Sequence, residues 1–300
     1  MAQIIDGKSI AATIKSELQI ESAAFISRTG TIPHLALLLV GDDPASQVYV
    51  RSKAKTCEEI GFRSTILNLP ATTSQEEVLD VIHSWNGNKL IHGILVQLPL
   101  PRHISEHKII ETISPSKDVD GLHPENMGRL VLGLPGFVPC TPAGIIELLS
   151  RSGISAQGKH AVVVGRSNIV GKPIANLLYQ KSPQANAVVT ICHTGASGTL
   201  RDFTRQADIL VAAIGVANRI TADYVKEGVA VIDVGINRIT DVAKKTGYRI
   251  VGDVDFESVL PKVSAITPVP GGVGPMTIVM LMRNTLEAAH RFTRNATINR

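Results

Sequence analysis

Aromatic residues and cysteines are scarce in this chain. Phenylalanine, tyrosine and tryptophan make up 4% of the 300 residues, so the core must be built mainly from valine, isoleucine, leucine and alanine. Those residues suit parallel strands that are buried on both faces. The three cysteines, Cys57, Cys140 and Cys192, lie far apart and include no C-x-x-C pair, which argues against a disulfide framework or a zinc knuckle. We expect free buried thiols in a reducing compartment.

Long apolar runs and clusters of like charge are absent as well. No apolar run is long enough to cross a bilayer, and the opening segment MAQIIDGKSI does not resemble a secretory signal. The 30 basic and 26 acidic residues are spread along the chain, so no basic patch indicates a nucleic-acid partner. The nine histidines form no H-E-x-x-H motif or metal-binding cluster. We therefore expect a cytoplasmic protein that binds no metal, nucleic acid or membrane.

Short apolar runs alternate with helical patterns along the whole chain. Candidate strands lie at 35–40, 63–69, 91–98, 160–165, 187–193, 208–215, 229–235 and 264–270. Candidate helices lie near 46–60, 74–85, 171–181, 199–206 and 221–227, with one more that has Thr141 as its N-cap. This alternation predicts βαβ units and parallel sheets. Because 300 residues are enough for two cores, we expect a two-domain α/β protein.

The stretch VVVGRSNIVGKP, residues 162–173, indicates a nucleotide site. A strand ends at Gly165 and a helix begins near Gly171, so helix N–H groups can face a pyrophosphate. The spacing is not the G-x-G-x-x-G fingerprint, and structural turn glycines would explain it about equally well. No acidic residue ends the next strand, where an NAD site usually has one, whereas Arg166 could bind a 2′-phosphate. The pattern favours NADP over NAD; the alternative is an exposed loop arginine.

Polar side chains in the first half suggest a second site. The stretch PASQVYVRSKAKTCEEIG is typical of a helix with Ser46 as N-cap, and it places Tyr49 and Lys53 on one face. By residue type alone, that pair is more often solvated than functional. Gln97 ends a buried strand, and Asp118 and Asp120 lie in a turn-rich loop; the alternatives are a strand-end cap and a solvated turn. The glycine-rich loop TPVPGGVGPMT can approach a planar ligand closely or serve as a plain connector.

Together, these stretches resemble one family, the bifunctional methylenetetrahydrofolate dehydrogenase/methenyltetrahydrofolate cyclohydrolases, or FolD family. The resemblance runs from residue 4 to beyond 277 and rests on IIDGK, VGDDPASQVYVRSK, GILVQLPLP, KDVDG, PCTPAG, VVVGRSNIVGKP, VIDVGIN, VGDVDF and TPVPGGVGPMT. It implies a folate-binding catalytic domain over 1–145, completed by a C-terminal helix over 275–295. It also implies a Rossmann-type NADP-binding domain over 146–274, an active-site cleft between the domains and a homodimer. The apolar segments 188–193 and 208–215 are possible edge strands for such a dimer.

The resemblance also implies roles for single residues. The implied catalytic residues are Lys53, Tyr49, Gln97 and Asp120: a catalytic lysine, a tyrosine that stacks near the folate ring, the polar partner of the lysine, and an acid that grips the pterin. The implied cofactor contacts are Gly165, Arg166, Ser167, Gly171, Thr194 and Ile236. The implied folate contacts are Tyr49, Lys53, Val96, Gln97, Leu98, Asp120, Pro270, Gly271, Gly272, Val273 and Gly274.

The implied activity has two steps in one-carbon metabolism, and its products serve purine biosynthesis. The enzyme would oxidise 5,10-methylenetetrahydrofolate to 5,10-methenyltetrahydrofolate with NADP⁺, and then hydrolyse it to 10-formyltetrahydrofolate. One stretch departs from the family: residues 193–198 read HTGASG, with Thr194 at a serine position and no lysine after it, which leaves Arg166 with less help at a 2′-phosphate. The alternatives are a monofunctional methylenetetrahydrofolate dehydrogenase, another NADP-dependent dehydrogenase such as a shikimate or amino-acid type, and a non-catalytic NADP-binding regulator.

Overall fold

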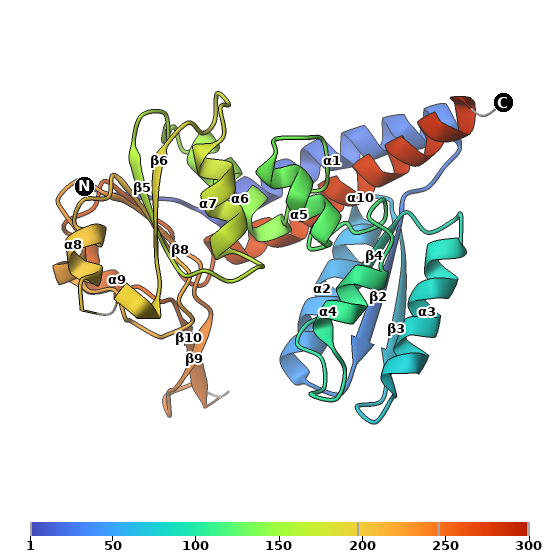
Figure 1. Cartoon of the computed structure of the whole chain (residues 1–300), viewed down its shortest axis with the longest axis horizontal. Helices are drawn as coiled ribbons and strands as arrows, with labels where there is room; N and C mark the ends of the chain where they lie inside the picture. Colours follow the sequence, from blue (N-terminus) through green and yellow to red (C-terminus); the bar gives the residue numbers. More distant parts are fainter. Residues whose placement is uncertain (1, 197, 245–246, 299–300) are drawn as a thin grey trace. The chain divides into compact units, whose positions relative to one another are not determined.

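The chain folds into two compact units, seen in a computed structural model that describes residues 2–196, 198–244 and 247–298 (Figure 1). The three-stranded unit contains Thr13–Cys140 and the C-terminal segment from Ile278. The six-stranded unit contains the N-terminal segment to Ala12 and Thr141–Thr277. This division differs from the expected one at the N-terminus, because β1 (Gln3–Ile4) pairs with β11 (Ala265–Ile266) in the six-stranded sheet. The chain changes units inside α1 (Gly7–Thr29) and α10 (Val273–Ile298), and also at the start of α6 (Cys140–Arg151).

The three-stranded unit is built on a parallel sheet in the order β3-β2-β4. Its strands are β2 (His34–Val40), β3 (Arg63–Leu69) and β4 (Gly93–Val96). Every residue of the central strand β2, HLALLLV, is buried, as the continuous apolar run predicts. The helices that lie wholly within this unit are α2 (Pro44–Glu59), α3 (Gln75–Gly87), α4 (Glu106–Thr112) and α5 (Pro124–Val131).

Helix α2 begins two residues earlier than expected. The carboxylate of Asp43 caps the helix by accepting a hydrogen bond from the backbone N–H of Ser46 at 2.7 Å, and Pro44 occupies the first turn. The expectation that Ser46 is the N-cap is therefore wrong; its side chain is buried inside the first turn. The helix ends before Gly61, whose φ of 79° lies in the left-handed region. The predicted apolar stripe is confirmed, because α2 buries Val50, Ala54 and Cys57.

The six-stranded unit is an all-parallel sheet in the order β1-β11-β8-β7-β5-β6. Its remaining strands are β5 (His160–Val164), β6 (Val188–Cys192), β7 (Ile209–Ala212) and β8 (Ala230–Asp233), and β9 (Asn237–Thr240) and β10 (Tyr248–Val251) form a separate antiparallel pair. Its helices are α6, α7 (Gly171–Tyr179), α8 (Leu200–Thr204), α9 (Phe256–Val259), and the 3₁₀ turns η1 (Thr194–Ala196) and η2 (Ala222–Tyr224).

Three expectations for this unit need correction. The helix expected at 221–227 is only the short turn η2, because its flanking residues Thr221 and Val225 are extended. Helix α6 begins at Cys140, so Thr141 is a helical residue instead of the N-cap. Segment 208–215 is no edge, because β7 lies between β5 and β8; segment 188–193 contains β6, which ends the sheet.

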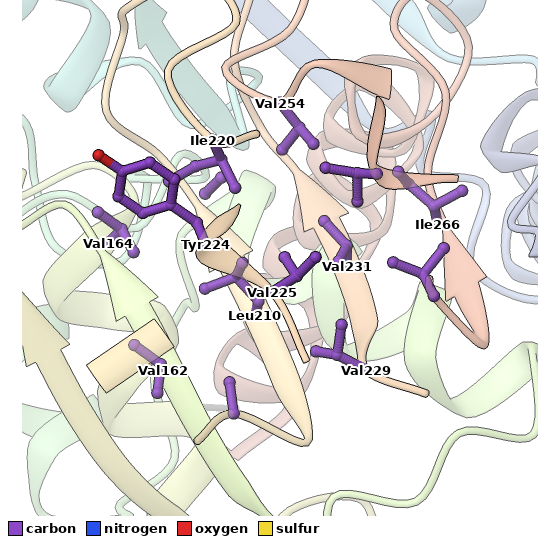
Figure 2. Packing of buried hydrophobic residues seen from close by; sticks show 14 of the residues in the cluster. Val162, Val164, Leu210, Ile220, Tyr224, Val225, Val229, Val231, Val254 and Ile266 are labelled. Atoms are coloured by element: carbon purple, nitrogen blue, oxygen red, sulfur yellow. The ribbon is translucent and has the colours of Figure 1, made fainter. Parts of the chain in front are cut away.

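The sheet order creates a switch point beside β5. In the sheet, β6 lies on one side of β5 and β7 lies on the other. The loop after β5 therefore leads toward β6, whereas the loop after β7 leads away from it toward β8, and the two loops start at neighbouring carboxyl ends. Figure 2 shows the apolar packing that fixes these strands, in which Val162 and Val164 of β5, Leu210 of β7 and Val231 of β8 belong to one buried cluster. In open α/β sheets, ligands bind at such a switch point.

Candidate active site

Lys53 is buried and bonded to Gln97. Only 9% of its surface is exposed, and its Nζ donates a hydrogen bond to Oε1 of Gln97 at 2.9 Å. The other end of the Gln97 amide is fixed as well, since Nε2 donates to the carbonyl oxygen of Leu98 at 2.7 Å. Burial lowers the pKa of the Lys53 ammonium, while the neighbouring Asp120 carboxylate acts in the opposite direction. Lys53 is therefore not a solvated surface lysine.

Tyr49, one helical turn before Lys53, is 40% exposed. The two side chains differ because Lys53 follows the buried stripe of α2 whereas Tyr49 lies at its edge. Val96, at the end of β4, is buried, and Leu98 is half-buried. The Tyr49 ring thus remains available to a ligand, and the Lys53 amine lies in a drier environment beside Gln97.

The two aspartates of the KDVDG stretch have different surroundings. Asp118 is 2% exposed, and its carboxylate accepts hydrogen bonds from the N–H of Leu122 (3.2 Å), the N–H of His123 (2.8 Å) and Nδ2 of Asn126 (2.8 Å). Burial raises the pKa of Asp118 to about 7 against the opposing effect of those donors. A solvated turn is thus the wrong interpretation of Asp118, which instead holds the loop together. Asp120 is partly exposed and lies close enough to Lys53 to raise the pKa of the lysine.

Cys140 belongs to the surroundings of Lys53 and Asp120, which its sequence position does not reveal. Its side chain is 2% exposed, and its Sγ donates to the carbonyl oxygen of Val119 at 3.4 Å. Burial raises the pKa of the thiol well above its usual value, and the nearby Asp120 carboxylate raises it further. The thiol therefore stays protonated and carries no charge. A lysine with a lowered pKa beside an acceptor amide and a carboxylate can transfer protons.

In the six-stranded unit, glycines shape the predicted nucleotide turn. Gly165 directly follows β5 with a φ of 128°, and a Cβ there would collide with the carbonyl oxygen of Ala213. A Cβ on Gly171 would collide with the carbonyl of Gly165. Between them, the Ser167 hydroxyl accepts hydrogen bonds from the N–H groups of Val170 (3.1 Å) and Gly171 (3.3 Å). The turn is therefore tight, and α7 begins at its end.

The other expected cofactor contacts are on the surface of this unit. Arg166, Thr194 and Ile236 are all exposed; Thr194 opens η1, and Ile236 follows β8. Within the described part of the chain, Arg166 forms no ion pair, so its guanidinium is available for a phosphate. Ser197, inside the HTGASG stretch, lies outside the described residues. A dinucleotide fits these features because it needs a close backbone turn, a helix N-terminus and a cation.

The loop Pro270–Gly274 is held against the start of α1. The carbonyl oxygen of Gly271 accepts a hydrogen bond from the N–H of Lys8 at 2.9 Å, and a Cβ on Gly7 would collide with Gly272. Val273 is buried at the start of α10, whereas Pro270 is exposed. The IIDGK stretch therefore supports this loop, which sequence reasoning missed because the two segments lie about 265 residues apart.

Two protein-family models match the chain. The model described as tetrahydrofolate dehydrogenase/cyclohydrolase, catalytic domain, matches residues 5–120, and the NAD(P)-binding domain of the same description matches residues 139–293.

Among the described residues, no helix combines the length and the apolar character that a membrane span requires.

Similar proteins match over nearly their whole length. A bifunctional protein FolD of Chlorobium chlorochromatii is 57% identical over 96% of this chain and 98% of its own. The crystal structure of the bifunctional FolD dehydrogenase/cyclohydrolase of Campylobacter jejuni is 50% identical, with a TM-score of 0.90 over 97% of this chain and 99% of that one. The dehydrogenase-cyclohydrolase of Trypanosoma brucei, solved with NADP cofactor and inhibitor, is 40% identical, with a TM-score of 0.91 over 98% of each chain.

Proposed function

Because the chain belongs to the tetrahydrofolate dehydrogenase/cyclohydrolase family, we propose that it catalyses two consecutive reactions of tetrahydrofolate interconversion. It oxidises 5,10-methylenetetrahydrofolate to 5,10-methenyltetrahydrofolate with NADP⁺, and it then hydrolyses that product to 10-formyltetrahydrofolate. Both steps belong to one-carbon metabolism, and we propose that the product serves purine biosynthesis. The two matched family models argue against a shikimate-type or amino-acid dehydrogenase.

The buried amine of Lys53 carries the proposal for the hydrolytic step. Water that attacks the cationic methenyl carbon must lose a proton, and the opening ring nitrogen must gain one. A solvated lysine is almost fully protonated at neutral pH, but burial lowers the pKa of Lys53, so its neutral form is more accessible. The hydrogen bond of 2.9 Å to Gln97 orients the nitrogen. We propose that Lys53 moves this proton and that Gln97 holds it in position.

Asp120 and Tyr49 are proposed to bind the folate. An ionised carboxylate only accepts hydrogen bonds, which matches the amino and ring N–H groups of a pterin. The exposed ring of Tyr49 offers a flat surface for stacking beside Lys53. The folate contacts expected at Val96, Leu98 and Pro270–Gly274 remain predictions of the family resemblance.

The six-stranded unit is proposed to bind NADP. When bound, NADP⁺ supplies the acceptor for the hydride of the dehydrogenase step. Gly165, Ser167 and Gly171 let the backbone and the start of α7 approach a pyrophosphate, and the exposed guanidinium of Arg166 pairs with the 2′-phosphate. Thr194 adds a hydroxyl, and the backbone at Ile236 meets the nicotinamide end. These residues orient the cofactor for hydride transfer.

We further propose a homodimer and a cytoplasmic location. Strand β6 ends the six-stranded sheet and exposes Val188 (65%) and Ile191 (45%), which supports pairing between two copies at this edge. Light scattering should then give about twice the chain mass of 32.0 kDa; a monomer at micromolar concentration would contradict the dimer. The three buried free cysteines support a reducing compartment.

One assay tests the central proposal. Purified protein is mixed with 5,10-methylenetetrahydrofolate and either NADP⁺ or NAD⁺, and ultraviolet absorbance follows the reduced cofactor and the methenyl intermediate. We expect NADPH to form while little methenyl intermediate accumulates. Stoichiometric accumulation of the intermediate would favour the monofunctional dehydrogenase. A parallel assay with 5,10-methenyltetrahydrofolate and no nucleotide measures the hydrolysis alone, corrected for the spontaneous rate without protein.

A further inference from the structure

The carboxylate of Asp253 lies at the centre of a hydrogen-bond network in the six-stranded unit. The residue is fully buried, and it follows β10 in the stretch VGDVDF. Its Oδ2 accepts hydrogen bonds from the N–H groups of Ile214 (2.5 Å) and Gly215 (2.9 Å). Its Oδ1 accepts from the N–H of Val216 (3.0 Å) and from Nδ2 of Asn237 (2.9 Å). Two oxygens thus receive four donors, three of them consecutive backbone amides.

Three of these donors belong to the loop that follows β7, and the fourth, Asn237, begins β9 directly after the loop that follows β8. The loop after β7 begins at Ala213, whose N–H donates to the carbonyl oxygen of Val164 at 2.8 Å and whose own carbonyl closes over Gly165. It therefore forms one wall of the predicted nucleotide turn at the switch point. Asn237 directly follows Ile236, the residue expected at the nicotinamide end. Asp253 joins these two loops without being exposed to a ligand.

A second buried carboxylate fixes the backbone of Asp253. Asp233, at the end of β8, is 3% exposed, and its Oδ1 accepts from the N–H groups of Gly235 and Asp253, both at 2.9 Å. A Cβ on Gly235 would collide with Asp253, and a Cβ on Gly252 would collide with the carboxylate of Asp233. The stretches VIDVGIN and VGDVDF are thus coupled, because each glycine makes room for an aspartate of the other stretch.

This arrangement sets the loop shape before any ligand arrives. Free loop amides would have to be ordered when a nucleotide binds, and that ordering weakens affinity. Here an internal anion already holds Ile214, Gly215 and Val216. We propose that Asp253 is a positioning residue for nicotinamide nucleotide binding, in which its carboxylate holds the β7 and β8 loops in the shape that receives the cofactor. The inference rests on the proposed function.

The variant Asp253→Asn tests the inference. The asparagine keeps the size, but in either orientation its NH₂ group faces donors that the carboxylate accepted, so the loop should lose its fixed shape. We expect the dissociation constant for NADPH, measured by its fluorescence with no folate present, to rise by about tenfold or more. Hydrolysis of 5,10-methenyltetrahydrofolate without nucleotide should stay within about twofold of the parent, given the proposed lysine chemistry in the other unit.

Asp118→Asn is the matched control, because Asp118 is also a buried carboxylate that accepts three donors but lies in the three-stranded unit. It should lower the unfolding temperature without changing NADPH affinity. If Asp253→Asn does not fold, Asn237→Ala decides the matter: removal of this one donor should weaken NADPH binding by about threefold. If both single variants fold, adding Asn237→Ala to Asp253→Asn should not weaken NADPH binding further, because the two residues act through the same hydrogen bond.

Two outcomes would overturn the inference. The first is that Asp253→Asn binds NADPH as tightly as the parent and Asp118→Asn do. If only Asn237→Ala folds, the same result in that variant counts instead. The other is an equal loss of nucleotide binding and nucleotide-free hydrolysis, which would indicate general unfolding. Failure of the proposed function is seen separately, because the parent chain itself would then bind no NADPH or hydrolyse no methenyl substrate.

Discussion

The two units build their candidate sites from different parts of the chain. In the three-stranded unit, side chains carry the proposed chemistry: a buried amine, an amide and a carboxylate on Lys53, Gln97 and Asp120. In the six-stranded unit, the backbone forms most of the proposed nucleotide site. Gly165 and Gly171 are important there because they have no Cβ atom, which would collide with neighbouring backbone. A proton-transfer site needs functional groups of suitable pKa, whereas a nucleotide site needs close approach and aligned N–H groups. Substitutions in one unit should therefore separate the two activities.

The largest separation is expected from Lys53→Met, which removes the amine and keeps much of the bulk. Cyclohydrolase activity should fall about 10²–10⁴-fold, the usual range for lost acid–base catalysis. Hydride transfer needs no protein proton donor, so dehydrogenase activity should fall less and the methenyl intermediate should accumulate. Spectrophotometric assays of both steps measure this. Lys55→Met is the matched control, because its side chain on the same helix is 76% exposed; equal effects of the two variants would make Lys53 an ordinary lysine.

Gly165→Ala should have the opposite selectivity: it should impair the nucleotide-dependent dehydrogenase step and spare the hydrolysis. The alanine would carry a strained φ near 128° and a Cβ that collides with the carbonyl of Ala213. Strain and displacement together should weaken NADPH binding roughly 100-fold or more, while nucleotide-free hydrolysis persists. Gly158→Ala is the control, because that glycine also has a positive φ of 67° but open space around its Cα. Parental NADPH affinity in Gly165→Ala would remove the turn from the cofactor site.

Arg166→Ala should sharpen the difference between NADP and NAD. Loss of a charge-assisted contact to the 2′-phosphate should weaken NADP binding by about 1.5–3 kcal/mol and leave NAD binding nearly unchanged. Titration of both cofactors against the parent and the variant gives the two affinities. Arg205→Ala removes an equal charge elsewhere in the unit and should not discriminate. A loss of the same size for NADP and NAD would reject the 2′-phosphate role of Arg166.

The smallest expected effect concerns pH and Asp118. Burial raises its folded-state pKa from 3.8 to about 7, so the folded chain binds the proton more tightly than the unfolded chain does. Its contribution to stability is therefore fullest below pH 4 and is lost as the pH rises toward 7. Relative to Asp118→Asn, the parent should become steadily less stable over that range, measured by thermal unfolding at constant ionic strength. A difference between the two proteins that does not vary with pH would contradict this.

The sequence predicted elements well where periodicity determines burial. The stripe of α2, the buried strand β2 and the alternation around β5 follow from residue type and spacing. It also placed Lys53 and Tyr49 on one face of a helix, but residue type favoured a solvated pair. Burial of Lys53 depends on Gln97, 44 residues away, and no local pattern reports such a contact.

The missed features all depend on contacts between distant segments. Asp118 and Asp120 are equivalent in the local pattern, yet only Asp118 is enclosed by the helix that follows it. The carboxylate of Asp253 meets amides 37 to 39 residues earlier in the chain. Ser46 is a good N-cap by type, but Asp43 takes the position because Pro44 fits the first turn. Local propensity therefore identifies elements, and tertiary contacts decide which side chains they bury.

The pairing of β1 with β11 has a consequence for synthesis on the ribosome. Gln3 and its partner Ala265 are separated by 262 residues, so the six-stranded sheet stays open at this edge until β11 has been made. At about 5–20 residues per second, that interval lasts roughly 13–52 s. The segment from Thr13 to Cys140 emerges well before then and can begin to collapse. Until β11 appears, β1 must therefore stay unpaired, although α1 connects it to the three-stranded unit, which can form earlier.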